Sequence, residues 1–559
     1  MTRLRRALAF LEGLVQRPLG LWLVFALGLA VYAFRAIGWP LIVGRDLDEY
    51  LYDYIQFLDR HPLLPWSMLF RTPVPGIVDG AVLDIAHGFF AEPVMAILFA
   101  GSVVAWTAAA GAYSARAALF VAVALLIYPA WGLMFHELSS EPIFCAGFAL
   151  WALLVVRAAQ TPSPGRFLSV GLATAVLALI RPGNALLIAF VLFALVLPGA
   201  WRARARWAGA FLVGAVVPLA AWAVLNGVRF GDYTLARGGN AVIPFYRAFI
   251  SDKIVAPNNG PASRKLANAI QHHLLTRNPY KGYGVTLHEV FASGSFRIHE
   301  DLYNLSDQVF GWKSNYSILR KAGIEAVEKH PRKYFGGVAH TIWRQLSNSY
   351  FRAAPPPARA STQPTKTPTV AVKGRRLPAP TEGQPIPGGQ NAWISRPDND
   401  IRQVWSSPTH YHFAFRTAAQ RRRFDQIKRE LDSLFAALPD RRGSVTLSHR
   451  LDQLSRWFPR SIVWIAIGVV ALIWRRPRGA RTLIALALGA LFVTVFNALG
   501  LFADPRFALP VAPAFVLFGS CTLLGVRPRD ERRGHAGARP SRQRGQRRPR
   551  RPSKVRQAS

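Results

Sequence analysis

The sequence is poor in cysteine and lacks the common motifs of nucleotide-dependent and metal-dependent enzymes. Only two of its 559 residues are cysteine, Cys145 and Cys521, and each lies inside an apolar run, so no disulfide framework is expected. The chain has no P-loop, no GxGxxG and no Cys or His cluster at metal-ligand spacing. Nucleotide hydrolysis is therefore not indicated, no cofactor is expected, and the ligand spacing does not support a divalent metal.

Charged residues are also scarce, at 18% of the chain, against about a quarter in an average globular domain. Hydrophobic types make up 51% of the residues, and they gather in runs of about 20, the length that crosses a bilayer. A purely soluble protein is therefore excluded. The net charge of +38 alone would suggest a nucleic-acid partner, but 13 of the basic residues lie in one polar segment, 527–559, so no nucleic acid is expected.

The apolar runs predict an all-α polytopic membrane protein with about ten transmembrane helices. They gather at the two ends of the chain, so that an N-terminal membrane module, 1–226, and C-terminal membrane helices, 461–526, flank a more polar domain, 227–460. The predicted spans are 18–42, 91–111, 116–134, 141–157, 167–180, 184–200, 207–226, 461–475, 482–501 and 506–526.

The distribution of arginine predicts how these spans are oriented. With the N-terminus inside, the short inside segments carry 14 arginines and the short outside loops carry five. Because positively charged loops stay on the cytoplasmic side, we expect a multi-pass plasma-membrane protein with both termini in the cytoplasm. Three segments then face outward: the first loop, 43–90, the short turn at 135–141, and the domain 227–460.

Two segments of the chain have a composition that cannot build a core. Residues 353–389, inside the outer domain, are rich in Pro, Thr and Ala and are predicted to be a disordered connector. The basic tail, 527–559, is predicted to be disordered and cytoplasmic, where it would contact anionic membrane lipids. The rest of the outer domain has apolar residues at helical spacing near 318–329 and 415–438, which predicts a mostly helical domain.

Directly after the first span, Asp46, Asp48 and Glu49 place three carboxylates within four positions at the membrane surface. They are typical of the start of an interfacial helix, where the helix dipole favours acids in the first turn. They also suit a general base, because a carboxylate near hydrocarbon can have its pKa tuned for proton transfer. The pattern alone leaves both interpretations open.

A second polar group, His136 with Glu137 and Glu141, lies in the short outward turn before the fourth span. Ser and Pro residues around Glu141 are common at the start of a helix, which is sufficient to explain the turn. Both this turn and the first loop are predicted to lie outside, however, so their acids are able to face one another.

Two arginines interrupt apolar stretches near the outer surface, Arg181 and Arg506. A guanidinium at such an interface either extends its charge to water or pairs with an anion. Arg506 is well placed to hold a phosphate, because its planar fork makes bidentate contacts, although pairing with Asp504 is the competing interpretation.

Five short motifs follow one another along the predicted outer face and resemble those of a known enzyme class. That class is the GT-C class of glycosyltransferases that use polyprenyl-phosphate sugars, particularly the protein mannosyltransferase and lipid A aminoarabinose transferase branch. The motifs are Asp48-Glu49-Tyr50-Leu51-Tyr52, Arg71-Thr72-Pro73, Ser140-Glu141-Pro142, Ala178-Leu179-Ile180-Arg181-Pro182 and Arg506-Phe507-Ala508-Leu509-Pro510. The resemblance covers two stretches of the chain, 18–230 and 461–526.

The resemblance implies that the chain transfers a sugar from a polyprenyl-phosphate donor to an acceptor hydroxyl, with inversion, at the extracytoplasmic face of the membrane. The acceptor would be a glycan, lipid or protein of the cell envelope. By resemblance Asp48 is the candidate base, Asp46 is its rival, and Glu49 is a second acidic residue. The candidate phosphate ligands are Arg181 and Arg506, and the candidate substrate-positioning residues are Glu141, His136 and Arg71.

Two other functions stay open at this point. A membrane transporter would line its path with charged residues, and a non-catalytic scaffold would keep the shape of the class without its chemistry. The acids lie in predicted surface loops and no inverted repeat of broken spans is visible, which favours the enzyme over the transporter.

Overall fold

A computed structural model describes residues 2–44, 46–59, 62–85, 87–348, 370–372, 375–377, 401–405, 411–438, 441–475, 477, 479–502 and 504–525. The predicted basic tail, 527–559, lies outside the described residues. The predicted connector, 353–389, also lies outside them, except for β3 (Val370–Val372) and β4 (Arg375–Leu377), which pair antiparallel.

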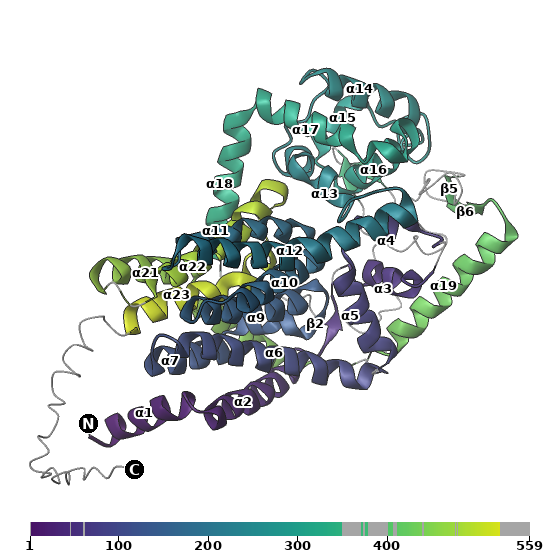
Figure 1. Ribbon diagram of the computed structural model, residues 1–559. Coiled ribbons are helices and arrows are strands. Elements are labelled where there is room, and N and C mark those ends of the chain that lie inside the picture. The colour runs from purple at the N-terminus through teal and green to yellow at the C-terminus, as the bar shows by residue number, and fades with distance from the viewer. Residues whose placement is uncertain are drawn as a thin grey trace, which may run out of the picture.

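The described chain is almost entirely helical, as predicted (Figure 1). The helices up to the outer domain are α1 (Thr2–Val15), α2 (Pro18–Ala36), α3 (Leu47–Gln56), α4 (Pro65–Phe70), α5 (Pro73–Asp84), α6 (His87–Gly111), α7 (Ala115–Leu126), α8 (Pro129–Leu133), η1 (Met134–His136), α9 (Ser140–Gln160), α10 (Pro164–Ile180), η2 (Pro182–Phe190), α11 (Val191–Val196) and α12 (Trp201–Phe230).

The second half continues with α13 (Gly238–Ala241), η3 (Val242–Ser251), α14 (Pro261–Ala269), η4 (Ile270–Leu274), α15 (Leu287–Ser293), α16 (Phe296–Phe310), η5 (Trp312–Ser314), α17 (Ser317–Lys329) and α18 (Pro331–Ser347). After the hairpin of β5 (Ile401–Trp405) and β6 (Tyr411–Phe415) come α19 (Ala418–Ala436), α20 (Val445–Trp457), α21 (Ser461–Arg475), α22 (Ala480–Gly500), η7 (Pro505–Phe507), η8 (Leu509–Val511) and α23 (Ala512–Leu524).

Six described helical stretches are long and apolar enough to cross a membrane, so the chain is a polytopic membrane protein. They are Pro18–Ala36, Phe89–Gly111, Ser140–Gln160, Trp201–Phe230, Val445–Arg475 and Ala480–Gly500. A seventh crossing is possible where Ala115–Leu126 and Pro129–His136 meet at a bend of 61°. Three shorter apolar stretches, Pro164–Ile180, Pro182–Val196 and Leu509–Leu524, coincide with other predicted spans, and the count of ten stays a prediction.

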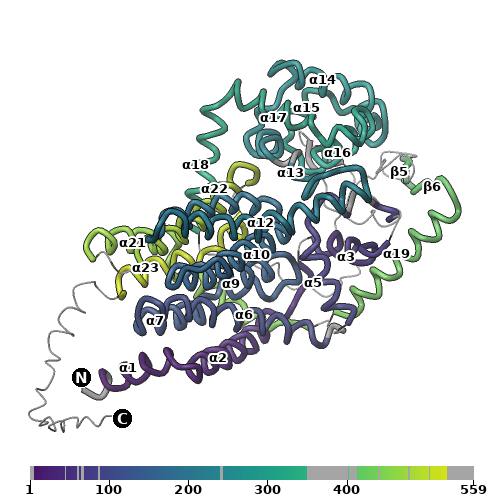
Figure 2. The backbone as a smooth tube through the Cα atoms, viewed as in Figure 1, coloured from purple at the N-terminus to yellow at the C-terminus, as the bar shows by residue number. Residues whose placement is uncertain are grey.

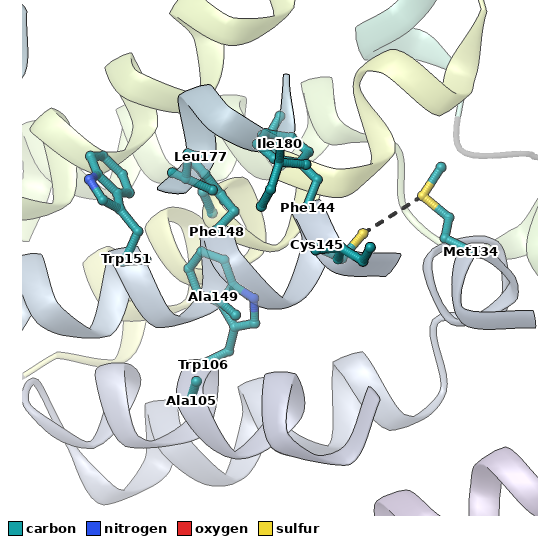
Figure 3. Packing of buried hydrophobic residues seen from close by; sticks show 14 of the residues in the cluster. Ala105, Trp106, Met134, Phe144, Cys145, Phe148, Ala149, Trp151, Leu177 and Ile180 are labelled. Atoms are coloured by element: carbon teal, nitrogen blue, oxygen red, sulfur yellow. Dashed lines mark hydrogen bonds between the residues drawn. The ribbon is translucent and has the colours of Figure 1, made fainter. Parts of the chain in front are cut away.

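The membrane helices pack through aromatic side chains in the middle of the bundle and through small residues where helices approach closely. Trp106 of α6 and Phe148 and Trp151 of α9 are fully buried, and Phe148 packs against both tryptophans (Figure 3). A Cβ atom added to Gly171 of α10 would lie only 2.1 Å from a backbone oxygen of α12. Glycine there lets the two backbones approach, which is a common way for membrane helices to associate.

The outer domain has a hydrophobic core of its own, separate from that of the bundle. Phe245 of η3, Leu302 of α16 and Leu319 of α17 are fully buried in it. Arg247 of η3 connects this core to the bundle, since its Nη1 donates to the carbonyl oxygens of Ala498 and Leu501 at 2.9 and 3.0 Å. The outer domain is thereby fixed against the end of α22.

Two contacts between distant segments shape the first outer loop. α19 packs along α3 and α5 (Figure 2), and Arg423 of α19 binds Asp59 at 2.6 Å. The strands β1 (Ile42–Val43) and β2 (Glu137–Leu138) form a short parallel pair, which the all-helical prediction did not include.

The β1–β2 pair continues into Gly44, whose N–H donates to the carbonyl oxygen of Leu138 at 3.0 Å. A Cβ atom at Gly44 would lie 2.3 Å from that same oxygen, so only glycine allows this approach. The start of the first outer loop is in this way held by backbone hydrogen bonds against the turn that precedes α9.

Candidate functional site

A cavity of about 330 Å³ lies where the first outer loop, the start of α9, the end of α10 and the end of α22 meet. Five of the eight predicted site residues line it, and they come from four separate parts of the sequence. They are Asp46, Arg71, Glu141, Arg181 and Arg506. Tyr50, Thr72, Ser140, Asn184 and Asn497 also contribute to its polar lining.

Asp46 stands on one side of this cavity, in a backbone conformation that few residues adopt. Its φ of 67° and ψ of 12° lie in the left-handed region, which aspartate tolerates better than most residues other than glycine. It occupies the N-cap position of α3, yet its side chain does not cap the helix. Instead its Oδ2 lies 3.3 Å from Nη1 of Arg71. The backbone therefore turns the carboxylate away from the helix and toward the cavity and Arg71.

Arg71 links Asp46 to a second, more buried carboxylate, that of Glu49 in the first turn of α3. The Nε of Arg71 makes a short ion pair with Oε2 of Glu49. Burial raises the pKa of Glu49 to about 7, because desolvation outweighs the opposing attraction of Arg71, and the negative charge of Asp46 adds to the rise. Arg71 also lies over the ring of Tyr50, with its Cζ 5.2 Å from the ring centre.

The outer domain brings another acid toward this group, which sequence patterns did not single out. Glu300 of α16 interacts electrostatically with Glu49 and Asp46. Burial raises its pKa well above the usual range, and nearby acids add to the shift while Arg297 opposes it. No local motif marks Glu300, because it reaches this group only through the folding of the outer domain.

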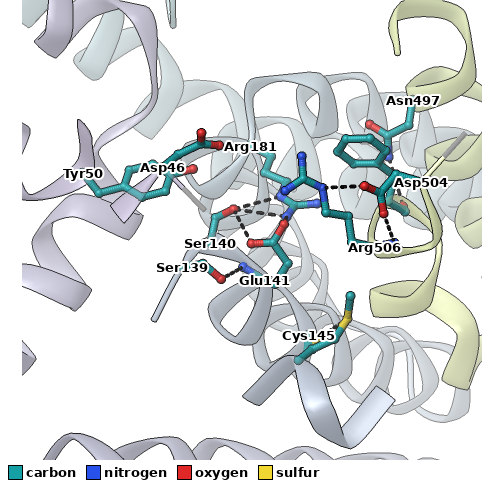
Figure 4. A network of polar contacts seen from close by, with 12 residues as sticks. Asp46, Tyr50, Ser139, Ser140, Glu141, Cys145, Arg181, Asn497, Asp504 and Arg506 are labelled. Atoms are coloured by element: carbon teal, nitrogen blue, oxygen red, sulfur yellow. Dashed lines mark hydrogen bonds and ion pairs between the residues drawn. The ribbon is translucent and has the colours of Figure 1, made fainter. Parts of the chain in front are cut away.

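The opposite side of the cavity carries two arginines (Figure 4). Nη2 of Arg181 lies 2.7 Å from Oε1 of Glu141 and donates to Oγ of Ser140 at 3.1 Å. Nε of Arg506 lies 3.3 Å from Oδ2 of Asp504, and Glu141 is close enough to Arg506 to interact with it electrostatically. In Figure 4 the two guanidinium groups converge near Glu141, with Asp46 and Tyr50 facing them from the first loop.

These side chains are held by ordinary helix-terminus chemistry. Ser139 caps α9 by accepting a hydrogen bond from the backbone N–H of Glu141 at 3.4 Å, and Pro142 follows in the first turn. Asp504 caps η7 in the same way, accepting from the N–H of Arg506 at 3.0 Å. The turn before α9 is thus a helix start, as its sequence indicates, and Asp504 also pairs with Arg506. Glu141 and Arg506 line the cavity as well.

The remaining predicted residues lie behind the cavity wall or beside it. Asp48 is in the first turn of α3 but is not part of the cavity lining. His136 is buried and its ring stacks on that of Tyr32, with centroids 4.2 Å apart. Glu137 of β2 is mostly buried, and burial together with the charge of Glu141 raises its pKa to about 8 against the opposing pull of Arg506.

An apolar groove of about 720 Å³ follows the cavity along the same two structural elements. η2 lines the cavity with Pro182 and Asn184, and it lines the groove with Leu186, Leu187, Ala189 and Phe190. α22 lines the cavity with Phe496 and Asn497, and it lines the groove with residues between Ile484 and Val495. Arg481, near the N-terminal end of α22, is the charged residue in the groove lining. The polar cavity and the apolar groove therefore share two elements, η2 and α22.

Within the described part of the chain, no group of three or more His, Cys, Asp or Glu side chains gathers closely enough to hold a metal ion. The acids of the site are instead paired with arginines. The described residues therefore offer proton transfer and phosphate binding as their own chemistry.

No family model matches the chain, and no curated protein matches it. Among solved structures it is similar to ArnT from Cupriavidus metallidurans bound to undecaprenyl phosphate, with 14% identity, over 91% of this chain and 78% of that chain, at a TM-score of 0.31. The apo state of the same protein gives 15% identity over 90% of this chain and 76% of that chain, at a TM-score of 0.28. At this identity, no residue role is carried over from the match.

Proposed function

We propose that the chain transfers a sugar from a polyprenyl-phosphate donor to an acceptor hydroxyl at the extracytoplasmic face of the membrane. The observation that supports this most directly is the composition of the cavity, where Asp46 faces Arg181 and Arg506 across a shared space. A base on one side and two cations on the other suit a reaction in which an acceptor loses a proton and a phosphate leaves.

The adjoining groove fits the donor's lipid part. An isoprenoid chain is long and apolar, and the groove is lined almost wholly by Leu, Ile, Val, Ala and Phe side chains of η2, α11 and α22. The cavity and the groove share η2 and α22. The chain of a donor whose phosphate is held by Arg181 and Arg506 would therefore extend along these two elements into the groove.

The proposed reaction assigns each cavity residue one task. Asp46 accepts the proton of the acceptor hydroxyl while the hydroxyl oxygen attacks C1 of the sugar. The bond between C1 and the phosphate oxygen breaks, and the electron pair leaves with the phosphate. Arg181 and Arg506 stabilise the negative charge that develops there, and attack from the side opposite to the phosphate inverts C1.

Arg71 and Glu49 support this arrangement without touching the reacting atoms. Arg71 fixes the carboxylate of Asp46 through its contact at 3.3 Å, and Glu49 holds Arg71 in turn. The role of Asp46 replaces that of Asp48, the candidate favoured by resemblance, because Asp48 is absent from the cavity lining.

The orientation of the chain is part of the same proposal. The excess of arginine in the predicted inside loops favours cytoplasmic termini, which puts the cavity at the extracytoplasmic face. A fluorescent or enzymatic reporter fused to the N-terminus would test this: activity in the cytoplasm is expected, and activity only outside would contradict the orientation.

The direct test uses purified full-length protein with a polyprenyl-phosphate sugar. We expect the release of polyprenyl phosphate, increased by an extract of cell-envelope acceptors. Protein that is folded, yet neither binds polyprenyl phosphate nor releases it from any such donor, would contradict the proposal. Uptake of a solute into vesicles without donor cleavage would favour a transporter.

A further inference from the structure

Glu141 is already paired with Arg181, one of the two proposed phosphate ligands. Its Oε1 lies 2.7 Å from Nη2 of Arg181, and the carboxylate is within electrostatic reach of Arg506. The residue is only 7% exposed, so its charge has little water around it and depends on the two arginines. An anion thus already sits between the two proposed phosphate ligands.

Arg181 is not saturated by this contact. Its Nε and Nη2 point to Ser140, at 3.3 and 3.1 Å, and Nη2 also meets Glu141. These contacts use its Nε and Nη2, and the side chain lines the cavity. A phosphate can therefore approach Arg181 while Glu141 is still bound, which brings two anions close together in a buried site.

We propose that Glu141 is a displaceable counter-ion that competes with phosphate for Arg181 and so promotes the release of polyprenyl phosphate. This inference rests on the proposed function and adds a positioning and release role for one residue. In the empty site Glu141 keeps Arg181 oriented and its charge compensated. When phosphate binds, the two anions repel each other, and the return of Glu141 to Arg181 favours departure of the lipid product.

A purely supporting role for Glu141 predicts the opposite effect on affinity. If the carboxylate only holds Arg181 in place, then removing its charge should loosen the arginine and weaken phosphate binding. If it competes with phosphate, removing its charge should strengthen binding. The direction in which the affinity for polyprenyl phosphate changes therefore separates the two roles.

The experiment measures the affinity of purified full-length protein for a polyprenyl monophosphate in detergent, without any sugar donor. Glu141→Gln keeps a carbonyl oxygen able to accept from Arg181 but removes the charge. We expect it to bind polyprenyl phosphate about tenfold more tightly than the wild type or better, since like charges at such a site cost at least that much. Equal or weaker binding would overturn the inference.

Ser140→Ala is the matched control, because it removes a neutral contact to Arg181 and leaves the charge of Glu141 in place. It should bind polyprenyl phosphate more weakly than the wild type. If Glu141→Gln does not fold, Glu141→Ala carries the same expected sign, since it also removes the charge.

Turnover gives a second readout that a structural role would not produce. In Glu141→Gln both KM for the donor and kcat should fall, because tighter phosphate binding slows product release. A raised KM would contradict the inference. Failure of the wild type to bind polyprenyl phosphate at all would instead contradict the proposed function, so the two failures are distinguishable.

Discussion

Arginines paired with carboxylates occur in two settings: Arg237 in the outer domain, and Arg181 and Arg506 beside the cavity. The two settings differ in whether a ligand can reach the guanidinium. Arg237 in the outer domain is completely buried and contacts Asp232 at 3.0 Å and Asp307 at 2.9 Å. It also donates to the carbonyl oxygen of Trp312 at 2.6 Å and lies over the Trp312 ring, 3.6 Å from its centre. Asp232, Asp307 and Trp312 surround the buried guanidinium and leave no space for a ligand.

Arg181 and Arg506 each have one carboxylate partner and face a cavity. Their side chains are 17% and 14% exposed, whereas that of Arg237 is 0% exposed. The comparison teaches that an ion pair alone does not distinguish a structural arginine from a ligand-binding one. The distinguishing property is whether the guanidinium faces an open space in which a ligand can reach its donors.

The largest expected effect is at Asp46, the carboxylate on the cavity side of this comparison. Asp46→Asn should reduce transfer about 100-fold or more, because an amide cannot accept the acceptor's proton. The thermal midpoint should stay close to that of the wild type, since Asp46 lies at the cavity surface. The measurement is the initial rate of polyprenyl-phosphate release at saturating donor.

Asp48→Asn is the companion variant, two residues away in the same helix turn. Full activity in Asp46→Asn together with loss in Asp48→Asn would return the role of base to Asp48. The comparison would then lose its premise that an open cavity marks the reacting residues, because Asp48 is outside the cavity lining.

The next effect is on stability, at Arg237, the buried arginine of the outer domain. Arg237→Met should lower the free energy of unfolding by about 3–5 kcal/mol, because Asp232 and Asp307 would stay buried without their cation. Denaturant or thermal unfolding in detergent measures it. The double variant with Asp307→Asn should recover part of the loss; a single variant as stable as the wild type would show that the pairing is dispensable.

A smaller effect is expected for Arg506→Ala, which removes an arginine from the cavity. Its affinity for polyprenyl phosphate should fall about tenfold or more, the value of a lost hydrogen bond to a charged group, while stability changes little. Asp504 is left 23% exposed and so tolerates the loss. Arg116→Ala, which breaks an exposed pair with Glu12, is the control and should keep full affinity.

The last effect, which leaves turnover unchanged, concerns the pH dependence of stability at Glu137. Its pKa is about 8 in the folded chain, above the ordinary value of 4.5, because burial penalises the charged form. The folded state therefore holds a proton that the unfolded state has lost, and stability falls as pH rises from about 4.5 to about 8. Glu137→Gln should remove this slope, so its advantage in thermal midpoint over the wild type should grow across that range.

If the wild type and Glu137→Gln show the same dependence of thermal midpoint on pH, the carboxylate is not held neutral. Glu137 would then behave as an exposed acid, and burial would raise its pKa less than the structure indicates.

Much of this arrangement follows from the sequence. The apolar runs predict the membrane helices, and the positions of Glu141, Arg181 and Arg506 at helix ends follow from ordinary capping and proline patterns. The sequence allows acids of the first loop and of the turn before α9 to face one another, and in the structure Asp46 and Glu141 line one cavity.

The choice among neighbouring residues could not be made from spacing. Asp46 rather than Asp48 reaches the cavity because the left-handed backbone at residue 46 redirects its side chain, and no pattern in the sequence specifies that conformation. His136 was a candidate for substrate positioning, but its ring is buried against Tyr32. No local pattern in the sequence marks Arg237 as buried, because two of its partners, Asp307 and Trp312, lie 70 and 75 residues further along the chain.

The β1–β2 pair gives the site a property that no side chain in it has. Ile42 pairs with Glu137 and Val43 pairs with Leu138, so the register of these two strands determines where Asp46 lies relative to the turn before α9. A one-residue slip along a strand turns every following side chain to the other face. An insertion or deletion between Val43 and Asp46 would therefore change the distance between the proposed base and the phosphate ligands, even with every side chain of the site retained.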